Sequence, residues 1–124
     1  MTHYYDTIAE FTRDGFDIIV DKTYEDMHPR DHFEDDNMDE IIRKIDNGTY
    51  DWFMLRVRVL VEGLELGSSY LGGCLYEDPN EVLTDGVAED FIAEAMKEAK
   101  TKVYALSKKF AELSEQVDRE SACA

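Results

Sequence analysis

Residues 50–61, YDWFMLRVRVLV, decide how this chain folds. Apolar residues occupy every second position from Phe53 to Val61, and two arginines interrupt the opposite face. This alternation of aromatic and β-branched residues predicts a half-buried β-strand. Glu62-Gly63 then supplies a tight turn, and a second apolar stretch follows it. Residues 50–76 are therefore predicted to form a β-hairpin.

The second half of this hairpin is rich in glycine, at positions 67, 72 and 73. Glycine inside a strand indicates a bulge or the close approach of a neighbouring element. A further strand is predicted over residues 15–24, where apolar residues again alternate with charged ones. The start of the chain differs, because Tyr5, Ile8 and Phe11 recur at helical spacing and predict a short helix over residues 2–12.

Two more helices are predicted further along the chain. Residues 37–46 carry apolar residues at steps of three and four and end at Asn47-Gly48. Thr84-Asp85-Gly86 supplies capping candidates for a long helix over residues 87–118, whose apolar residues also step by three and four. We therefore expect one α+β domain over residues 1–124, with the last few residues disordered. Its antiparallel sheet of about three strands is covered on one face by both helices.

The predicted long helix exceeds the sheet that it is expected to cover. Thirty residues of helix span about 45 Å, whereas strands of ordinary length span roughly 20 Å. The far half is therefore expected to pack on a partner chain, giving a homodimer, or to fold back near Ser107.

Charge is the outlying feature of the composition. Asp and Glu number 29 against 13 Lys and Arg, so the formal net charge is −16. Residues 1–51 hold −10 of it and residues 52–90 hold −6, whereas residues 91–124 are neutral. Such a field repels nucleic acid and anionic membranes and attracts basic surfaces. General solubility or a salt-adapted proteome would spread acids over every exposed face, so the asymmetry favours a dedicated acidic surface.

Few other features bear on location or chemistry. The first residues contain neither a basic start nor an apolar run, and no stretch approaches ~20 apolar residues, so a cytoplasmic protein with free thiols is expected. His28 and His32 are four apart, but Pro29 disfavours a helix there and no third nitrogen or sulfur ligand is nearby. Ser68 has no recognisable base partner. No cofactor, metal or catalytic residue is therefore expected, and a small enzyme would need a cleft around His28, His32 or Ser68.

The acids are the best candidates for contacting a partner. Arg56 and Arg58 are expected to pair with strand carboxylates such as Asp17, Asp21 or Glu65. The candidate partner-binding residues are Asp17, Asp21, Glu25, Asp26, Asp31, Glu34, Asp35, Asp36, Asp39, Glu40, Glu77 and Asp78. In its size, its charge and runs such as Glu34-Asp35-Asp36, the chain resembles the small acidic phage and plasmid proteins that inhibit restriction or CRISPR complexes by imitating nucleic acid.

That resemblance implies a non-enzymatic protein that binds a basic, nucleic-acid-binding surface of another protein, without contacting nucleic acid or membrane itself. Duplex DNA carries one negative charge per ~1.7 Å of its axis, so a surface lined with carboxylates can compete for the same site. The alternative is a structural or regulatory module that dimerises through the long helix and binds by its apolar surface.

Overall fold

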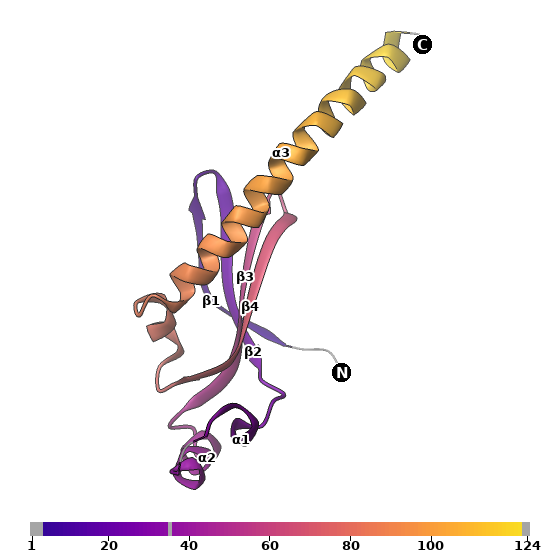
Figure 1. The fold of residues 1–124 in the computed structure, drawn as a ribbon. Coiled ribbons are helices and arrows are strands. Elements are labelled where there is room, and N and C mark those ends of the chain that lie inside the picture. Colours follow the sequence, from indigo (N-terminus) through magenta and orange to yellow (C-terminus); the bar gives the residue numbers. More distant parts are fainter. Residues whose placement is uncertain (1–3, 35, 123–124) are drawn as a thin grey trace.

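Four antiparallel strands form one sheet in chain order, and a long helix crosses one face of it (Figure 1). The computed structural model describes residues 4–34 and 36–122. The strands are β1 (Tyr5–Arg13), β2 (Phe16–Tyr24), β3 (Asp51–Val61) and β4 (Leu64–Tyr76). The helices are α1 (Pro29–His32), α2 (Met38–Asp46), the 3-10 helix η1 (Pro79–Leu83) and α3 (Val87–Ala122).

The α+β class, the 50–76 hairpin and the helices predicted over residues 37–46 and 87–118 are confirmed, but the sheet has four strands rather than three. The extra strand is β1, which was wrongly predicted to be helical. Its register with β2 shifts between Thr7 and Ala9, so Ile8 forms a bulge. A bulge inserts one residue into the alternation of a strand. The apolar spacing of three between Tyr5, Ile8 and Phe11 therefore arises from a bulged strand and not from a helix.

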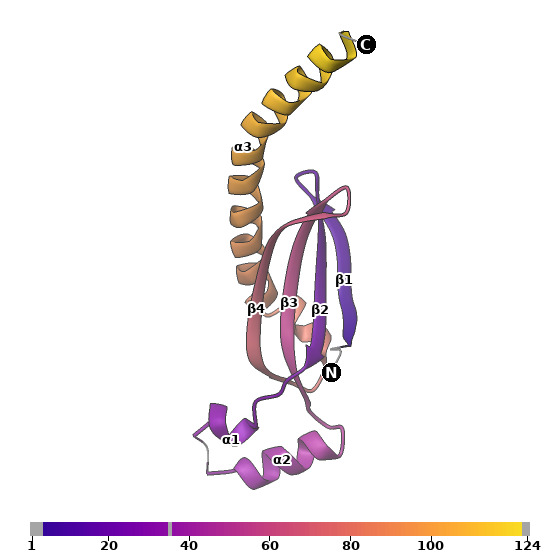
Figure 2. The same ribbon diagram turned by 90° about the vertical axis from the view of Figure 1, so that its right-hand side faces the viewer.

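The position of α2 also differs from the prediction. Helices α1 and α2 connect β2 to β3 and lie beyond one end of the sheet, so α2 covers neither face (Figure 2). The physical reason is the hairpin-like connection, since β2 ends and β3 begins at the same end of the sheet. Among the described residues, one face is covered by α3 and by the short helix η1, whose Val82 is buried in the core, and the opposite face carries no helix (Figure 2).

The core lies between the sheet and the first part of α3. Side chains from the two central strands and from α3 form one buried cluster, which includes Ile18, Leu55, Val57 and Ile92. The helix approaches β4 closely at Gly67, where an added Cβ would lie 2.1 Å from the carbonyl oxygen of Ala95. The glycine in this strand therefore serves the close packing that was predicted from the sequence.

The N-terminus of α3 is capped as expected. One carboxylate oxygen of Asp85 accepts a hydrogen bond from the Val87 backbone N–H at 2.9 Å. The other accepts one from the Tyr76 hydroxyl at 2.6 Å, which ties the helix start to the end of β4. Burial and this hydrogen bond raise the pKa of Tyr76 above its usual value. The cap thus fixes where α3 begins and how it enters the sheet face.

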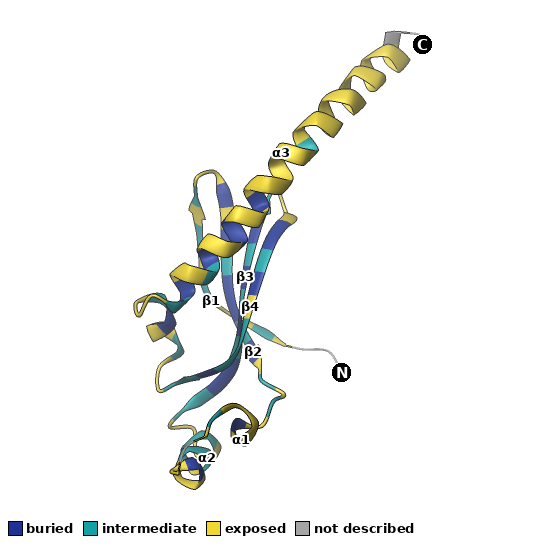
Figure 3. Cartoon of the chain, in the orientation of Figure 1, coloured by how far each residue is buried: buried dark blue, intermediate teal, exposed yellow. Residues whose placement is uncertain are grey.

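Helix α3 is continuous to Ala122 and projects well beyond the sheet, so it does not fold back at Ser107 (Figures 1 and 2). We call residues 87–100 the inner half and residues 101–122 the outer half. The inner half alternates buried and exposed positions, whereas the outer half is exposed almost throughout (Figure 3). The last few residues of the chain were expected to be disordered. Those after Ala122 lie outside the described residues. Within the described ranges, no helix combines the length and apolar composition of a membrane span.

Candidate interaction surfaces

The segment between β2 and β3, residues 25–46, forms an acidic lobe at one end of the molecule (Figure 2). It holds nine acids and three bases, a formal net charge of −6. Even if each of its three bases pairs with an acid, six negative charges therefore remain. Ion pairs join Arg30 of α1 to Asp39 of α2, and Lys44 to Glu40 within α2. The first of these pairs ties the two helices of the lobe together.

Polar contacts anchor the lobe to the sheet. The indole N–H of Trp52 at the start of β3 donates to the carbonyl oxygen of Met27 at 2.9 Å. The carboxylate of Glu25 accepts from the backbone N–H of Gly73 in β4 at 2.8 Å and from that of Met27 at 3.0 Å. Glu25 was predicted to contact a partner, but both of its oxygens are engaged inside the chain. It fixes the lobe in place and does not extend the acidic surface.

Aromatic packing completes the anchor. The imidazole of His32 lies 5.7 Å from the Trp52 ring and 4.7 Å from the Phe33 ring, measured between centroids. It also covers Gly73, where an added Cβ would lie 2.6–2.8 Å from three of its ring atoms. Gly73 has φ +71°, a conformation that glycine adopts without strain. The glycines of β4 are recognisable in the sequence, but no sequence signal indicates that His32 packs on one of them.

The remaining predicted acids lie in different parts of the molecule. Those of the lobe are exposed: Asp26, Asp31, Glu34, Asp36, Asp39 and Glu40. Glu77 and Asp78 are exposed just after β4, at the same end of the sheet as the lobe, since Tyr76 pairs with Asp51. Asp78 also accepts the Asn80 backbone N–H at 3.0 Å and so caps η1. Asp17 is exposed on the helix-free sheet face, and Asp35 lies outside the described residues.

Asp21 is withdrawn from the partner-binding set because it is only 1 % exposed. Its carboxylate accepts hydrogen bonds from Arg56 Nε at 3.0 Å, from Arg58 Nη2 at 3.2 Å and from the Thr7 hydroxyl at 3.3 Å. The Arg56 guanidinium also stacks on the Tyr5 ring, 3.4 Å from its centroid. The predicted pairing of both arginines with a strand carboxylate is confirmed for Asp21. A buried carboxylate with three side-chain donors holds the helix-free face of the sheet together.

The two histidines considered for catalysis make structural contacts. His28 caps α1 by accepting the Arg30 backbone N–H on Nδ1 at 3.2 Å. Burial raises the pKa of the Cys74 thiol to about 11, so this thiol is protonated at neutral pH. Among residues 4–34 and 36–122, no group of three or more His, Cys, Asp or Glu side chains could hold a metal ion.

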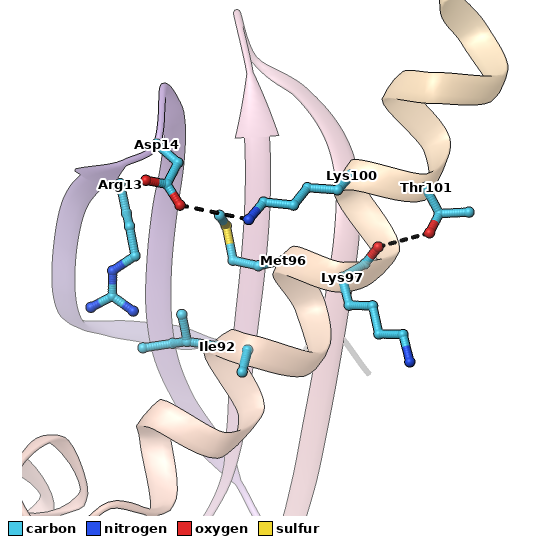
Figure 4. Close-up of a pocket in the computed structure, with 8 residues that line it drawn as sticks. Arg13, Asp14, Ile92, Met96, Lys97, Lys100 and Thr101 are labelled. Carbon is cyan, nitrogen blue, oxygen red and sulfur yellow. Dashed lines mark hydrogen bonds and ion pairs between the residues drawn. The ribbon is translucent and has the colours of Figure 1, made fainter.

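A hollow of about 490 Å³ lies between the β1–β2 turn and α3 (Figure 4). Three cations line it, namely Arg13, Lys97 and Lys100. Arg13 makes two hydrogen bonds to Glu89, at 2.9 and 3.0 Å, and Lys100 lies 3.6 Å from Asp14. Two of the three cations are therefore already paired within the chain, and the hollow is wide open to solvent.

The outer half of α3 is the second candidate surface. It exposes Phe110 and Val117 by 55 % and 57 %, and Val103 and Leu113 by 41 % each. Leu106 is partly buried against the core and joins this row to the inner half. We call these five residues the outer stripe. Large apolar side chains that line up on one exposed face mark an interaction site.

The molecule thus presents two candidate surfaces at opposite ends, the acidic lobe and the outer stripe (Figure 1). Comparison of the chain with protein-family models, with curated proteins and with solved structures finds no match.

Proposed function

We propose that this protein is an acidic binding protein that docks through its acidic lobe on a basic surface of another protein. The observation that carries the proposal is the separation of charge along the molecule. The lobe holds a net charge of −6, whereas residues 91–124, which include most of α3, sum to zero because their six bases offset their six acids. A protein that was acidic only for solubility would not need its negative charge concentrated at one end. The electrostatic field of the molecule therefore favours an approach in which the acidic lobe faces a cationic partner.

The anchoring of the lobe supports the same proposal. The contacts of Trp52, Glu25 and His32 hold the lobe against the sheet, so its exposed carboxylates are presented on a fixed framework. A surface that is ordered before binding loses less conformational entropy when it docks. Fixed negative charges also steer a cationic partner during approach and raise the association rate at low salt.

A basic groove that binds nucleic acid is the partner that we propose. Such a groove is built to hold closely spaced phosphates, so closely spaced carboxylates can occupy it. The protein would then act without catalysis, by blocking access, as do the small acidic inhibitors of host defence complexes that it resembles in size and charge. This mechanism needs no cofactor and no contact with nucleic acid.

The test begins with the tagged protein used to capture partners from cell lysate, with washes at about 0.1 M and about 0.5 M salt. At the higher salt the screening length falls from about 10 Å to a few Å, so a partner held by charge is released. A nucleic-acid-binding protein that is retained at low salt and released at high salt supports the proposal. Partners that stay bound at both salts would argue for an apolar interface instead.

A pair of matched variants then assigns the surface. In the lobe variant, Asp31→Asn, Glu34→Gln and Asp36→Asn remove three exposed charges. In the control variant, Glu94→Gln, Glu112→Gln and Glu115→Gln remove three exposed charges from α3, away from the outer stripe. Exposed pairs contribute about 0.2–1 kcal/mol each, so the lobe variant should bind the captured partner about 3-fold to 150-fold more weakly at 0.1 M salt. Equal affinities of the two variants would contradict a role for the lobe.

A further inference from the structure

The outer stripe has the spacing of a coiled-coil seam. Its residues, from Val103 through Leu106, Phe110 and Leu113 to Val117, are separated alternately by three and four positions. An apolar residue at every first and fourth position of a seven-residue repeat is the pattern by which two helices pack side by side. Apart from Leu106, these side chains are exposed, so the stripe lacks the second helix that the pattern specifies.

The outer stripe continues the face of α3 that packs on the sheet. At 100° per residue, the buried residues Ala88, Ile92, Ala95 and Ala99 lie within the same sector of about 80° as the outer stripe. The sheet covers this face along the inner half and ends near the middle of the helix (Figures 1 and 2). An occupant of the outer stripe therefore has about 33 Å of helix to contact, from residue 101 to residue 122, before it meets the sheet.

We propose that this occupant is the outer half of a second copy of the chain, packed antiparallel. In a parallel pair, both sheets would lie at the same end of the pair. Each sheet would also lie on the side of its helix that faces the other helix, so the two sheets would clash. In an antiparallel pair, each sheet lies beyond the free end of the other helix. The antiparallel arrangement therefore lets the whole length of both outer stripes meet.

The charges of the outer half favour the same orientation. Residues 101–111 contain three lysines and no acid, a net charge of +3. Residues 112–122 contain four acids and Arg119, a net charge of −3. Antiparallel packing places the basic part of each helix beside the acidic part of the other, whereas parallel packing places like charges together.

Glu120 sharpens this argument, because it follows Val117 by three positions and so continues the row of the outer stripe. In a parallel pair, the two copies of Glu120 would face each other across the seam. In an antiparallel pair that sets Phe110 opposite Leu113 of the second copy, Glu120 lies opposite Val103 of that copy, next to its Lys102. The chain therefore matches itself in shape and in charge in one orientation.

The first experiment measures the mass of the protein by light scattering after size exclusion, at loading concentrations from about 1 to 300 µM. We expect the mass to rise toward twice the 14.3 kDa of one chain. The outer stripe spans just over two heptads, fewer than the three to four over which such a seam is recognised, so dissociation at the lowest concentrations is expected. A constant mass of one chain at 300 µM would overturn the proposal.

Two variants locate the interface. Phe110→Glu with Leu113→Glu places charges in the seam at exposed positions and should leave a monomer at 300 µM, with unchanged circular dichroism. Tyr104→Glu is the matched control, since Tyr104 is 70 % exposed on the opposite side of the same helix and should leave the dimer intact. A dimer that persists in the double variant would overturn the assignment to the outer stripe.

The orientation is tested by the distance between two spin labels. Ser121→Cys carries the label in a chain with Cys123→Ser, while the buried Cys74 stays unlabelled. In the antiparallel dimer residue 121 lies opposite residue 102 of the second copy, so the two labelled backbones are roughly 30 Å apart. A parallel dimer would bring them within about 15 Å. A distance below about 20 Å would overturn the antiparallel arrangement.

Discussion

The two halves of α3 share one apolar pattern but have opposite surroundings. In the inner half, Ile92, Ala95 and Ala99 are buried against the sheet. In the outer half, Phe110, Leu113 and Val117 continue the same stripe and remain exposed. Periodicity in a sequence therefore shows which face of a helix will be covered but not what covers it. In this helix a four-stranded sheet covers the first half, and among the described residues only Leu106 of the second half packs against the core.

Residue size distinguishes the halves where periodicity does not. The buried face of the inner half carries three alanines, Ala88, Ala95 and Ala99. Their small side chains allow the backbone of α3 to approach β4 closely at Gly67. The outer stripe carries only larger residues, Val103, Leu106, Phe110, Leu113 and Val117. Small residues favour close packing of a helix on a backbone, whereas larger apolar residues fit the spacing between two helices. This difference in size is visible in the sequence and separates a core face from an interface.

The largest expected effect compares one residue from each half. Ile92→Ala removes a buried side chain from the core and should lower the free energy of unfolding by about 3 kcal/mol. Phe110→Ala truncates an exposed side chain and should change it by less than about 0.5 kcal/mol when the protein is dilute enough to be monomeric. Urea unfolding followed by circular dichroism at about 1 µM measures both values.

The same pair of variants can also contradict the comparison. Equal losses of stability from Ile92→Ala and Phe110→Ala in the dilute protein would mean that the outer half is packed within its own chain. Repeating the unfolding of the wild type and of Phe110→Ala at about 300 µM separates packing of α3 within its own chain from association between two chains. There the wild type should gain stability from association, and the variant should gain less.

A smaller effect is expected where the inner half meets β4. Gly67→Ala places a Cβ 2.1 Å from the carbonyl oxygen of Ala95, so the helix must shift away from the strand. Overpacking of this kind should lower the free energy of unfolding by about 2 kcal/mol. Ser68→Ala, on the other face of the same strand, is the control and should change it by less than about 0.5 kcal/mol. A stability of Gly67→Ala equal to that of the control would show that α3 adjusts freely on the sheet.

Much of this fold follows from alternation and from helical spacing. The β3–β4 hairpin, α2 and the start of α3 at Val87 lie where the pattern predicts them. The first strand was missed because the bulge at Ile8 changes the phase of its alternation. The position of α2 was also missed, because periodicity identifies the apolar face of a helix but not the element that it meets. That contact depends on the connection between β2 and β3.

The candidate surfaces were predicted less completely, because the sequence shows charge but not burial. Asp21 and Asp17 are both acids on β2, yet Asp21 is buried among arginines and Asp17 is exposed. Their cross-strand partners differ, since Asp21 pairs with Arg56 whereas Asp17 pairs with Leu60. The register of β2 on β3 therefore decides which acid is structural. No count of acids along the chain contains that information.

The smallest expected effect concerns the ion pair that joins the start of α3 to β1. The hydrogen bonds and charge of Arg13 hold the pKa of Glu89 below its ordinary value of 4.5. A lowered folded-state pKa means that the pair stabilises the protein above the unfolded-state pKa, and that this stabilisation is lost as the pH falls through the folded-state pKa. Both side chains are about half exposed, at 40 % and 54 %, so solvent screens the pair and its contribution is expected to be about 0.5 kcal/mol or less.

Glu89→Gln tests this contribution, because it removes the charge and keeps the shape of the side chain. The variant should lose up to about 0.5 kcal/mol at pH 7, and its difference from the wild type should shrink as the pH falls below the ordinary glutamate pKa of 4.5 and through the lowered pKa of Glu89. Glu94→Gln removes the same charge one turn later on α3, away from Arg13, and should match the wild type over this pH range. If Glu89→Gln and Glu94→Gln lose the same stability at pH 7, the effect comes from the net charge of α3. If only Glu89→Gln loses stability and its loss disappears at low pH, the Arg13 pair helps to fix the inner half on the sheet.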